Sequence, residues 1–127
     1  MLKERHAYIL GMPLNDASAE ASPLVVWEGS HEMMRAAFAA HLKDVPPADW
    51  GEVDLTDVYQ HTRRAVFETC RRVILPLKFG EAILVHRLAL HGVAPWGDGA
   101  EAPEEGRMIA YFRPEFQGLG DDWLTAI

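Results

Sequence analysis

The spacing of apolar residues changes from a helical period to a strand period past residue 70, and the change limits what the chain can fold into. In the middle of the chain, apolar side chains such as Met34, Phe38 and Leu42 recur at helical spacing. From Val73 onward they alternate with a period of two, which is typical of strands, and Ala82–His91 is almost continuously apolar. The sequence therefore predicts a chain of strands with helices inserted, and it holds no heptad run or internal repeat.

The predicted elements are about six strands, with two helices between the second and the third. Strands are expected at 6–12, 23–27, 73–79 and 107–112, with one bent strand or two short ones within 82–91, and helices at 30–42 and 55–70. Ser30 is expected to cap the first helix, and Asp54 or Thr56 the second. Pro76 indicates an edge strand or a bulge. Residues 96–106, rich in glycine and acidic side chains, are expected to form an exposed loop.

Length and composition indicate one globular domain over residues 1–127, with the helical insert at about 31–70. The chain has 127 residues, of which 49% are hydrophobic and 24% charged, close to the average for globular proteins. Its single cysteine, Cys70, excludes an internal disulfide and suits a reducing compartment, so we expect a cytoplasmic protein. Cys70 lies on an apolar helix stripe without an activating neighbour, and we expect it to be inert.

The net charge of the chain argues against a nucleic-acid partner, and its hydropathy argues against a membrane span. A formal net charge of −7 and a pI near 5.3 repel phosphate backbones, so nucleic acid is not expected as a partner. No apolar run approaches the roughly 20 residues of a membrane span, and the first residues lack the apolar core of a signal peptide. A small molecule is the expected ligand.

Two residues at strand ends are candidates for chemistry. His91 ends the apolar run and precedes Gly92, which permits a bend, so its ring either faces a cavity or forms part of the core. In an unbroken strand His86 and His91 point to opposite faces, so they should not bind one ion together. Arg107 opens the last strand and is either an arginine at the rim or the partner of a carboxylate in a bidentate pair.

Other candidates and several absences narrow the choice. Trp27 and Trp96 border loops, where they either line a pocket or simply pack. The sequence has no glycine-rich phosphate loop, no nucleophile elbow and no paired-cysteine zinc signature. No histidine is followed two places later by Asp or Glu.

Three segments carry a resemblance to a known family. Residues 78–92, KFGEAILVHRLALHG, followed by residues 107–112, RMIAYF, resemble the C-terminal part of phytanoyl-CoA dioxygenase-like proteins, which are Fe(II)- and 2-oxoglutarate-dependent oxygenases. Residues 23–31, PLVVWEGSH, are similar to that family's strand ending in a Gly-Ser-His turn. The matches extend over nearly the whole chain.

The resemblance implies a cupin-like jelly roll, or double-stranded β-helix, that hydroxylates a small organic substrate with Fe(II) and 2-oxoglutarate. The iron of such enzymes is held by two histidines and a carboxylate. His91 matches the second histidine ligand, and Arg107 matches the arginine that binds the far carboxylate of 2-oxoglutarate. Ser30 and His31 match the turn near the site, and we expect Tyr111, Trp27 and Trp96 to line the pocket with them.

The chain departs from the family pattern in four respects. The family's His-x-Asp ligand pair precedes the segment that matches residues 6–12, and this sequence does not contain it. About six strands are expected where a jelly roll has eight, so the first strands are expected to be missing. Val93 stands where the family commonly has a small hydroxyl residue, and the loop from His91 to Arg107 is longer than usual.

Two alternatives to a working oxygenase remain open. One is a non-catalytic jelly-roll remnant that binds a small molecule or pairs with another chain or a second copy, because open strand edges recruit partners. The other is a histidine-based zinc hydrolase, for which the sequence offers no paired ligand spacing.

Overall fold

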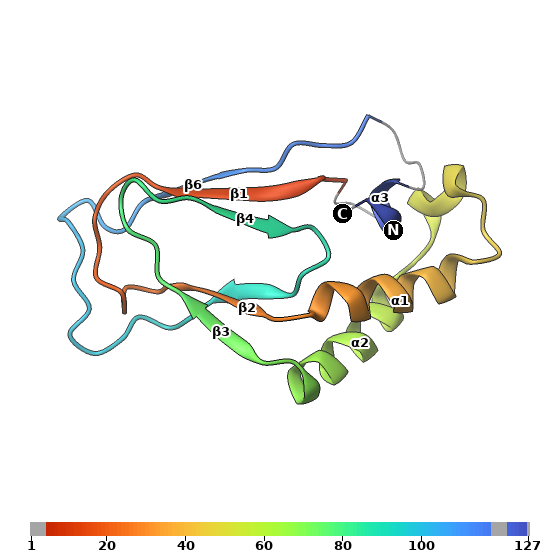
Figure 1. Cartoon of the computed structure of the whole chain (residues 1–127), viewed down its shortest axis with the longest axis horizontal. Coiled ribbons are helices and arrows are strands. Elements are labelled where there is room, and N and C mark those ends of the chain that lie inside the picture. Colours follow the sequence, from red (N-terminus) through yellow and green to blue (C-terminus); the bar gives the residue numbers. More distant parts are fainter. Residues whose placement is uncertain (1–4, 118–121, 127) are drawn as a thin grey trace.

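Two antiparallel sheets of three strands each form the framework of the molecule, and the computed structural model describes residues 5–117 and 122–126. The first sheet has the order β4-β1-β6, and the second has the order β3-β2-β5. The strands are β1 (Tyr8–Pro13), β2 (Leu24–Trp27), β3 (Arg72–Leu75), β4 (Ile83–His86), β5 (His91–Val93) and β6 (Ile109–Phe112). The prediction of six strands is confirmed for the described residues, and Figure 1 shows the first sheet above the second.

The first strand of each sheet in the sequence is also its central strand. In β1, Leu10 pairs with Leu84 of β4 on one side and with Phe112 of β6 on the other. In β2, Val26 pairs with Val73 of β3 and with His91 of β5. Within the described residues, the outer edges of β4 and β6 in the first sheet and of β3 and β5 in the second therefore have no neighbouring strand.

The inserted helices cover one end of the two sheets. α1 (Ser30–Leu42) and α2 (Thr56–Thr69) lie between β2 and β3, joined by the 3-10 helix η1 (Pro47–Glu52). Figure 1 shows both helices at the right-hand end with α3 (Asp122–Thr125), while the connections β1–β2, β3–β4 and β5–β6 gather at the left-hand end. The helical insert is confirmed, but η1 and α3 were not expected, because each is too short to show a helical period in the sequence.

The prediction that Ser30 caps the first helix is wrong. Gly29, with a φ of 77°, is the N-cap of α1, and Ser30 is the first residue of the helix. The Ser30 hydroxyl is buried, donates to the Trp27 carbonyl at 2.6 Å and accepts from the Leu90 N–H at 2.8 Å. A buried hydroxyl has to find such partners, so this serine joins β2 to the chain before β5 instead of capping the helix.

The start of α2 differs from both predicted caps in a smaller way. Leu55 is the N-cap residue, and it contributes no side-chain hydrogen bond. The carboxylate of Asp54 accepts a hydrogen bond from the Thr56 N–H at 2.9 Å, and hydrogen bonding to Thr56 lowers the pKa of Asp54. Asp54, one residue before the N-cap, therefore provides an acceptor for a backbone N–H of the first helical turn that has no partner within the helix.

The strands β3, β4 and β5, between α2 and the acidic loop 96–106, are shorter than the sequence pattern predicted. β3 ends at Leu75, immediately before Pro76, and forms an edge of its sheet, as the proline indicated. The run 82–91 forms two strands, because a turn in which the Ala89 N–H donates to the His86 carbonyl separates β4 from β5. His86 and His91 therefore belong to different sheets.

Most of the buried apolar surface lies at the helical end. The larger core cluster joins α1, α2 and α3 to the chain between β4 and β5, and consists of Met34, Phe38, Leu42, Trp50, Leu55, Val66, Leu88, Leu90, Trp123 and Leu124. Between the sheets the buried cluster is small: Ile9, Leu24 and Val85. None of the helices in the described part of the chain is long and apolar enough to cross a membrane.

Candidate functional site

His91 is the first residue of β5, where the chain leaves the helical end and enters the second sheet. Its Nδ1 lies 2.8 Å from the carbonyl oxygen of Ala89. Because a carbonyl only accepts, Nδ1 carries the proton in the neutral ring, and the lone pair is on Nε2. A backbone carbonyl on the other ring nitrogen is also how proteins commonly orient a histidine that binds a metal. The His91 ring is therefore prepared to accept a hydrogen bond or to bind a cation through Nε2.

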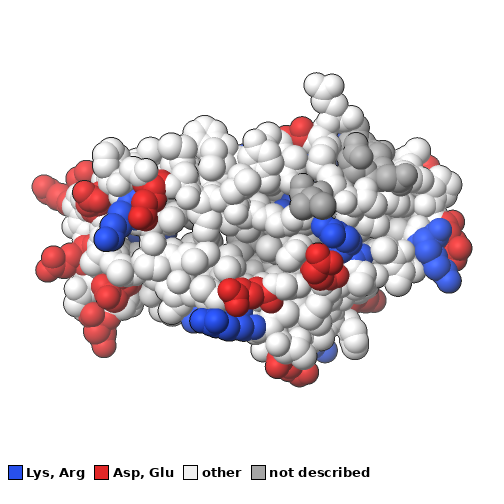
Figure 2. All heavy atoms as spheres, viewed as in Figure 1, with Lys and Arg blue, Asp and Glu red and all other residues white. Residues whose placement is uncertain are grey.

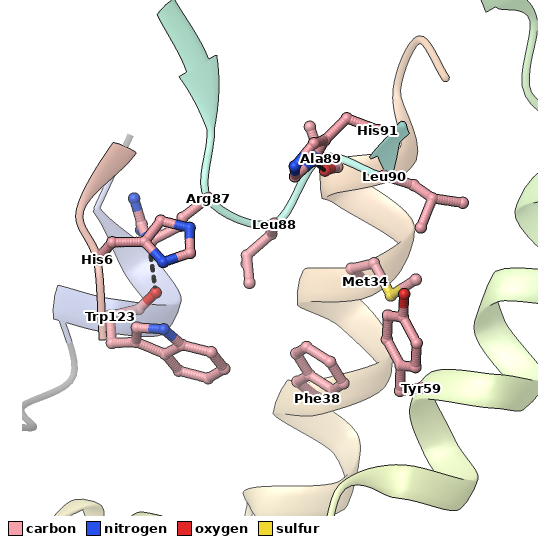
Figure 3. A pocket seen from close by; sticks show the side chains of 10 residues that line it. All are labelled: His6, Met34, Phe38, Tyr59, Arg87, Leu88, Ala89, Leu90, His91 and Trp123. Carbon is pink, nitrogen blue, oxygen red and sulfur yellow. Dashed lines mark hydrogen bonds between the residues drawn. The ribbon is translucent and has the colours of Figure 1, made fainter. Parts of the chain in front are cut away.

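A cavity of about 210 Å³ lies beside His91, at the junction of the helices and the sheets. Figure 3 shows the side chains around it, which come from α1, α2, α3, the turn after β4, the start of β5 and His6, two residues before β1. The lining residues are His6, Met34, Phe38, Tyr59, Arg87, Leu88, Ala89, Leu90, His91 and Trp123. The wall is mostly apolar with a few polar groups, which is the usual character of a small-molecule pocket.

Arg87 is the charged residue in this wall, and its hydrogen bonds hold the structure together. Its guanidinium donates to the carbonyl of Trp123 at 2.6 Å, to that of Ala7 at 3.2 Å and to that of Ala126, and it lies over the ring of Phe116. Burial, and secondarily the charge of a neighbouring arginine, lowers the pKa of Arg87. Arg87 thus connects the turn after β4 to both ends of the described chain.

Arg87 and His6 are two cavity residues that the sequence reasoning missed. Arg87 is the one charged residue within the apolar run 82–91, and a charge in such a run needs buried partners. The sequence alone could therefore have indicated that Arg87 is buried and has partners. His6 gives no comparable signal, because it precedes a strand and is brought to the cavity only by the tertiary fold.

Arg107 lies in a different place from His91. It is half-buried before β6 and lines a narrow recess of about 20 Å³ that His91 does not reach. The side chain of Asn15 holds this segment: it donates to the Gly106 carbonyl at 2.8 Å and accepts from the Met108 N–H at 3.1 Å. The structure therefore orders the backbone around Arg107 but does not bring Arg107 and His91 into one cavity.

The surroundings of Arg107 are acidic. Figure 2 shows acidic side chains gathered at the left-hand end of the molecule, over the connections between strands. The loop before Arg107 contributes the exposed residues Asp98, Glu101, Glu104 and Glu105. Among the described residues, no carboxylate forms an ion pair with the Arg107 guanidinium, so the structure does not show the bidentate pair that was one of the two alternatives for Arg107.

The other predicted pocket residues are placed apart from the cavity. Trp27 packs against Phe67, with ring centroids 5.0 Å apart, and Ser30 forms the buried hydrogen bonds described above. Trp96 is 51% exposed in the loop after β5. Trp27 and Trp96 do not line the cavity at His91, and the ring contact of Trp27 fits the packing alternative.

His31 and Tyr111 have neighbours that the sequence did not indicate. The ring of His31 lies beside that of His86, with centroids 5.0 Å apart. The ring of Tyr111 lies over Gly11 of the central strand β1, because a β-carbon built at Gly11 would be 3.1 Å from Tyr111 Cε1. Neither His31 nor Tyr111 lines the cavity at His91.

The described residues do not form a complete iron site. Across residues 5–117 and 122–126, no three side chains of His, Cys, Asp or Glu lie close enough together to hold a metal ion. A two-histidine, one-carboxylate site needs three such ligands. His91 can supply at most one of them.

Comparison with known proteins gives one structural similarity. The sequence matches no protein-family model and no curated protein. The chain is similar to the crystal structure of SnoK, a non-heme alpha ketoglutarate dependent carbocyclase from nogalamycin biosynthesis, with a TM-score of 0.48 and 20% sequence identity. The similarity covers 99% of this chain and 46% of that chain, so this chain spans about half the length of SnoK.

Proposed function

We propose that this chain is part of a jelly-roll oxygenase that depends on Fe(II) and 2-oxoglutarate and hydroxylates a small organic substrate. The observation that carries the proposal is His91, whose protonated Nδ1 leaves a lone pair on Nε2 beside an apolar cavity of about 210 Å³. In this proposal His91 is one ligand of the metal. The resemblance assigns the far carboxylate of 2-oxoglutarate to Arg107, whose guanidinium has the matching fork of donors, and the cosubstrate would have to reach from the cavity at His91 to the separate recess that Arg107 lines.

The order of the strands supports a jelly roll. Consecutive strands change sheet at every step except from β2 to β3, and the resulting orders are β4-β1-β6 and β3-β2-β5. Jelly rolls consist of eight strands in two such sheets. One additional strand beside β5 and one beside β6 would complete that number, and the small buried cluster between the sheets is consistent with their being absent from the described residues.

The iron site of this proposal needs ligands from outside the described residues. His91 accounts for one of the three groups, and the described part of the chain holds no cluster that supplies the other two. We therefore assign to this chain only what its own residues do. The apolar wall excludes water and holds a hydrocarbon part of the substrate, while the Ala89 carbonyl fixes the ring of His91.

A metal titration tests the role of His91. The histidines are isotope-labelled and observed by NMR while Mn(II), an air-stable substitute for Fe(II), is added in substoichiometric amounts with and without 2-oxoglutarate. We expect the ring signals of His91 to broaden first and His91→Ala to abolish the effect. The matched control is His61→Ala, an exposed residue on α2. Broadening centred on His31 and His86, or unchanged in His91→Ala, would overturn the assignment.

The role of Arg107 is tested in the same titration. Arg107→Gln should remove the effect of 2-oxoglutarate without changing the effect of Mn(II) alone, whereas Arg113→Gln, at an exposed position beyond β6, should change neither. A 2-oxoglutarate effect that survives in Arg107→Gln would refute the cosubstrate role. An in-frame His-x-Asp in the coding sequence before Met1 would identify the two other ligands.

The second candidate function is a non-catalytic module that pairs with another chain or a second copy of this one. It is favoured by the free edges of the four outer strands, β3, β4, β5 and β6, and by the incomplete metal site in the described residues. Light scattering at low micromolar concentration tests whether two copies of this chain associate. A stable dimer supports pairing between copies, and a monomer rejects it.

A further inference from the structure

The wall of the cavity at His91 is apolar and partly aromatic. Its apolar residues are Met34, Phe38, Leu88, Ala89, Leu90 and Trp123, and all of them except Ala89 are buried. The rings of Phe38 and Trp123 are stacked, with centroids 5.8 Å apart and an angle of 24° between their planes. Aromatic rings pair favourably with one another, and methionine adapts its shape to what it contacts. The wall therefore favours a flat apolar group.

The volume of the cavity limits the ligand to about one ring. An apolar cavity of roughly 150 Å³ takes up benzene. The cavity at His91 has about 210 Å³, which leaves room for a small substituent on such a ring. We therefore expect a ligand with one substituted ring.

The charge in the wall argues against a charged ligand of either sign. Among the described lining residues, Arg87 is the one arginine, lysine, aspartate or glutamate. Each of its three guanidinium nitrogens already donates to a backbone carbonyl, those of Trp123, Ala7 and Ala126. A ligand carboxylate would have to displace these carbonyls or lie unpaired against the apolar wall, and a ligand ammonium would be repelled by the guanidinium. An uncharged ligand avoids both costs.

The hydroxyl group of Tyr59 is a polar group of the wall that the protein itself does not use. Tyr59 lies on α2, and its backbone N–H donates to Leu55, but within the described part of the chain its hydroxyl forms no hydrogen bond. In Figure 3 this oxygen is at the end of the ring that points toward Met34 and Leu90. A phenolic hydroxyl both donates and accepts, so it can pair with either a hydroxyl or a carbonyl oxygen of a ligand.

The two histidines of the wall have other positions or roles. Nδ1 of His91 is oriented by the Ala89 carbonyl, and its Nε2 is the metal ligand in the proposed function. His6 lies with Arg87 on the opposite side of the cavity from Tyr59 (Figure 3). The Tyr59 hydroxyl is therefore the group that remains for an oxygen of the ligand.

We propose that the cavity at His91 binds an uncharged compound with one ring and one hydroxyl or carbonyl oxygen, and that Tyr59 selects for this oxygen. The ring lies against the apolar wall, and the oxygen forms a hydrogen bond with the Tyr59 hydroxyl. The inference deepens the proposed function, on which it rests, by naming the class of its substrate. Binding of the compound itself needs neither metal nor 2-oxoglutarate.

An NMR titration of the full chain tests the class of ligand. Methionine and leucine methyl groups are labelled, a metal chelator is present, and the probes are benzyl alcohol, benzoate and benzylamine. We expect benzyl alcohol to shift the signals of Met34, Leu88 and Leu90 saturably, while Leu84, which is 65% exposed on β4, stays unchanged. Benzoate and benzylamine carry opposite charges on the same ring and should bind at least about tenfold more weakly.

Two results on the unaltered protein would overturn the proposal. If benzyl alcohol produces no saturable shift at the three wall residues, the cavity is not the binding site. If benzoate or benzylamine binds as tightly as benzyl alcohol, the site does not select an uncharged compound.

The role of Tyr59 is tested with Tyr59→Phe, which keeps the ring and removes the oxygen. This variant should weaken benzyl alcohol by about 2- to 10-fold, the usual range for one neutral hydrogen bond, and leave toluene, which has no oxygen, unchanged. The matched control is Tyr111→Phe, which does not line the cavity and should change neither ligand. A merely structural role of Tyr59 would weaken both ligands alike. That result, or unchanged binding of benzyl alcohol, would refute the selection by Tyr59.

The two proposals fail independently. If benzyl alcohol binds as expected but Mn(II) does not broaden the signals of His91, the binding site stands and the oxygenase proposal falls. If Mn(II) selects His91 but benzyl alcohol does not bind, the substrate class is wrong and the metal assignment stands.

Discussion

Replacing Arg87 by methionine should destabilise the protein strongly, because one side chain holds three separate segments. The residue Arg87 is 9% exposed, and its guanidinium donates to the carbonyls of Ala7, Trp123 and Ala126. A hydrogen bond from a charged donor contributes about 1.5–3 kcal/mol, and an unmatched buried carbonyl costs a similar amount. Methionine retains part of the apolar contact and removes the cost of burying the charge.

The net loss expected for Arg87→Met is about 2–4 kcal/mol, well below the sum of three hydrogen bonds. For a chain of this length such a loss lowers the melting temperature by roughly 10 °C. Urea unfolding followed by far-ultraviolet circular dichroism measures it, with the fluorescence of the four tryptophans as a second probe. The control is Arg64→Met, an exposed change that should stay within about 0.5 kcal/mol.

The comparison of these two variants decides whether the reasoning is right. A loss below about 1 kcal/mol in Arg87→Met, or one no larger than in Arg64→Met, would show that the three carbonyls find other donors when Arg87 is absent. Faster hydrogen exchange at the amides of α3, at an unaltered midpoint by circular dichroism, would show that Arg87 holds only α3.

Three further changes test the sheets, the core and the pH dependence. Gly11→Ala places a β-carbon 3.1 Å from Tyr111 and should lower the free energy of unfolding in urea by about 1–3 kcal/mol. The control is Gly92→Ala, where the nearest neighbour of the new β-carbon is 3.8 Å away and the loss should not exceed that of an ordinary strand substitution. Equal losses in the two variants would contradict this reasoning. Val66→Ala, at a fully buried position, should cost about 2–3 kcal/mol, and a loss below 1 kcal/mol would mean that the helices repack. Burial and neighbouring positive charges hold the pKa of His86 below its usual 6.5, so at lower pH the unfolded chain binds more protons than the folded one. The free energy of unfolding should therefore be highest above pH 6.5 and fall as the pH decreases. His86→Gln should make this pH dependence weaker.

The sequence was sufficient for the elements that have a regular period. The helical stripe through Met34, Phe38 and Leu42 and the apolar run 82–91 each predict the element that the structure contains. Whether that run was one strand or two remained open, because the decisive feature is the turn at His86–Ala89 and a continuous apolar segment does not encode it. The short helix α3 lies below the length at which periodicity is visible.

The site was predictable only in part, for a physical reason. His91 was identified from its place at the end of an apolar run, and it does line the cavity. Arg107 was grouped with it by resemblance, but the structure places the two residues in separate recesses. Tyr59 and His91 line one cavity although they are far apart in the chain, which no local pattern reveals.

The position of the central strands has a consequence for how the chain folds during its synthesis. β1 is made before the other strands, yet Leu10 completes its pairing only with Phe112, about 100 residues later, and such distant pairing slows folding. During translation β2 can pair with β3 and β5 once Val93 has been made, whereas one side of β1 stays without its neighbour until β6 has left the ribosome. Chaperone dependence and losses to aggregation should therefore be set by this waiting period, and slower translation should not relieve them.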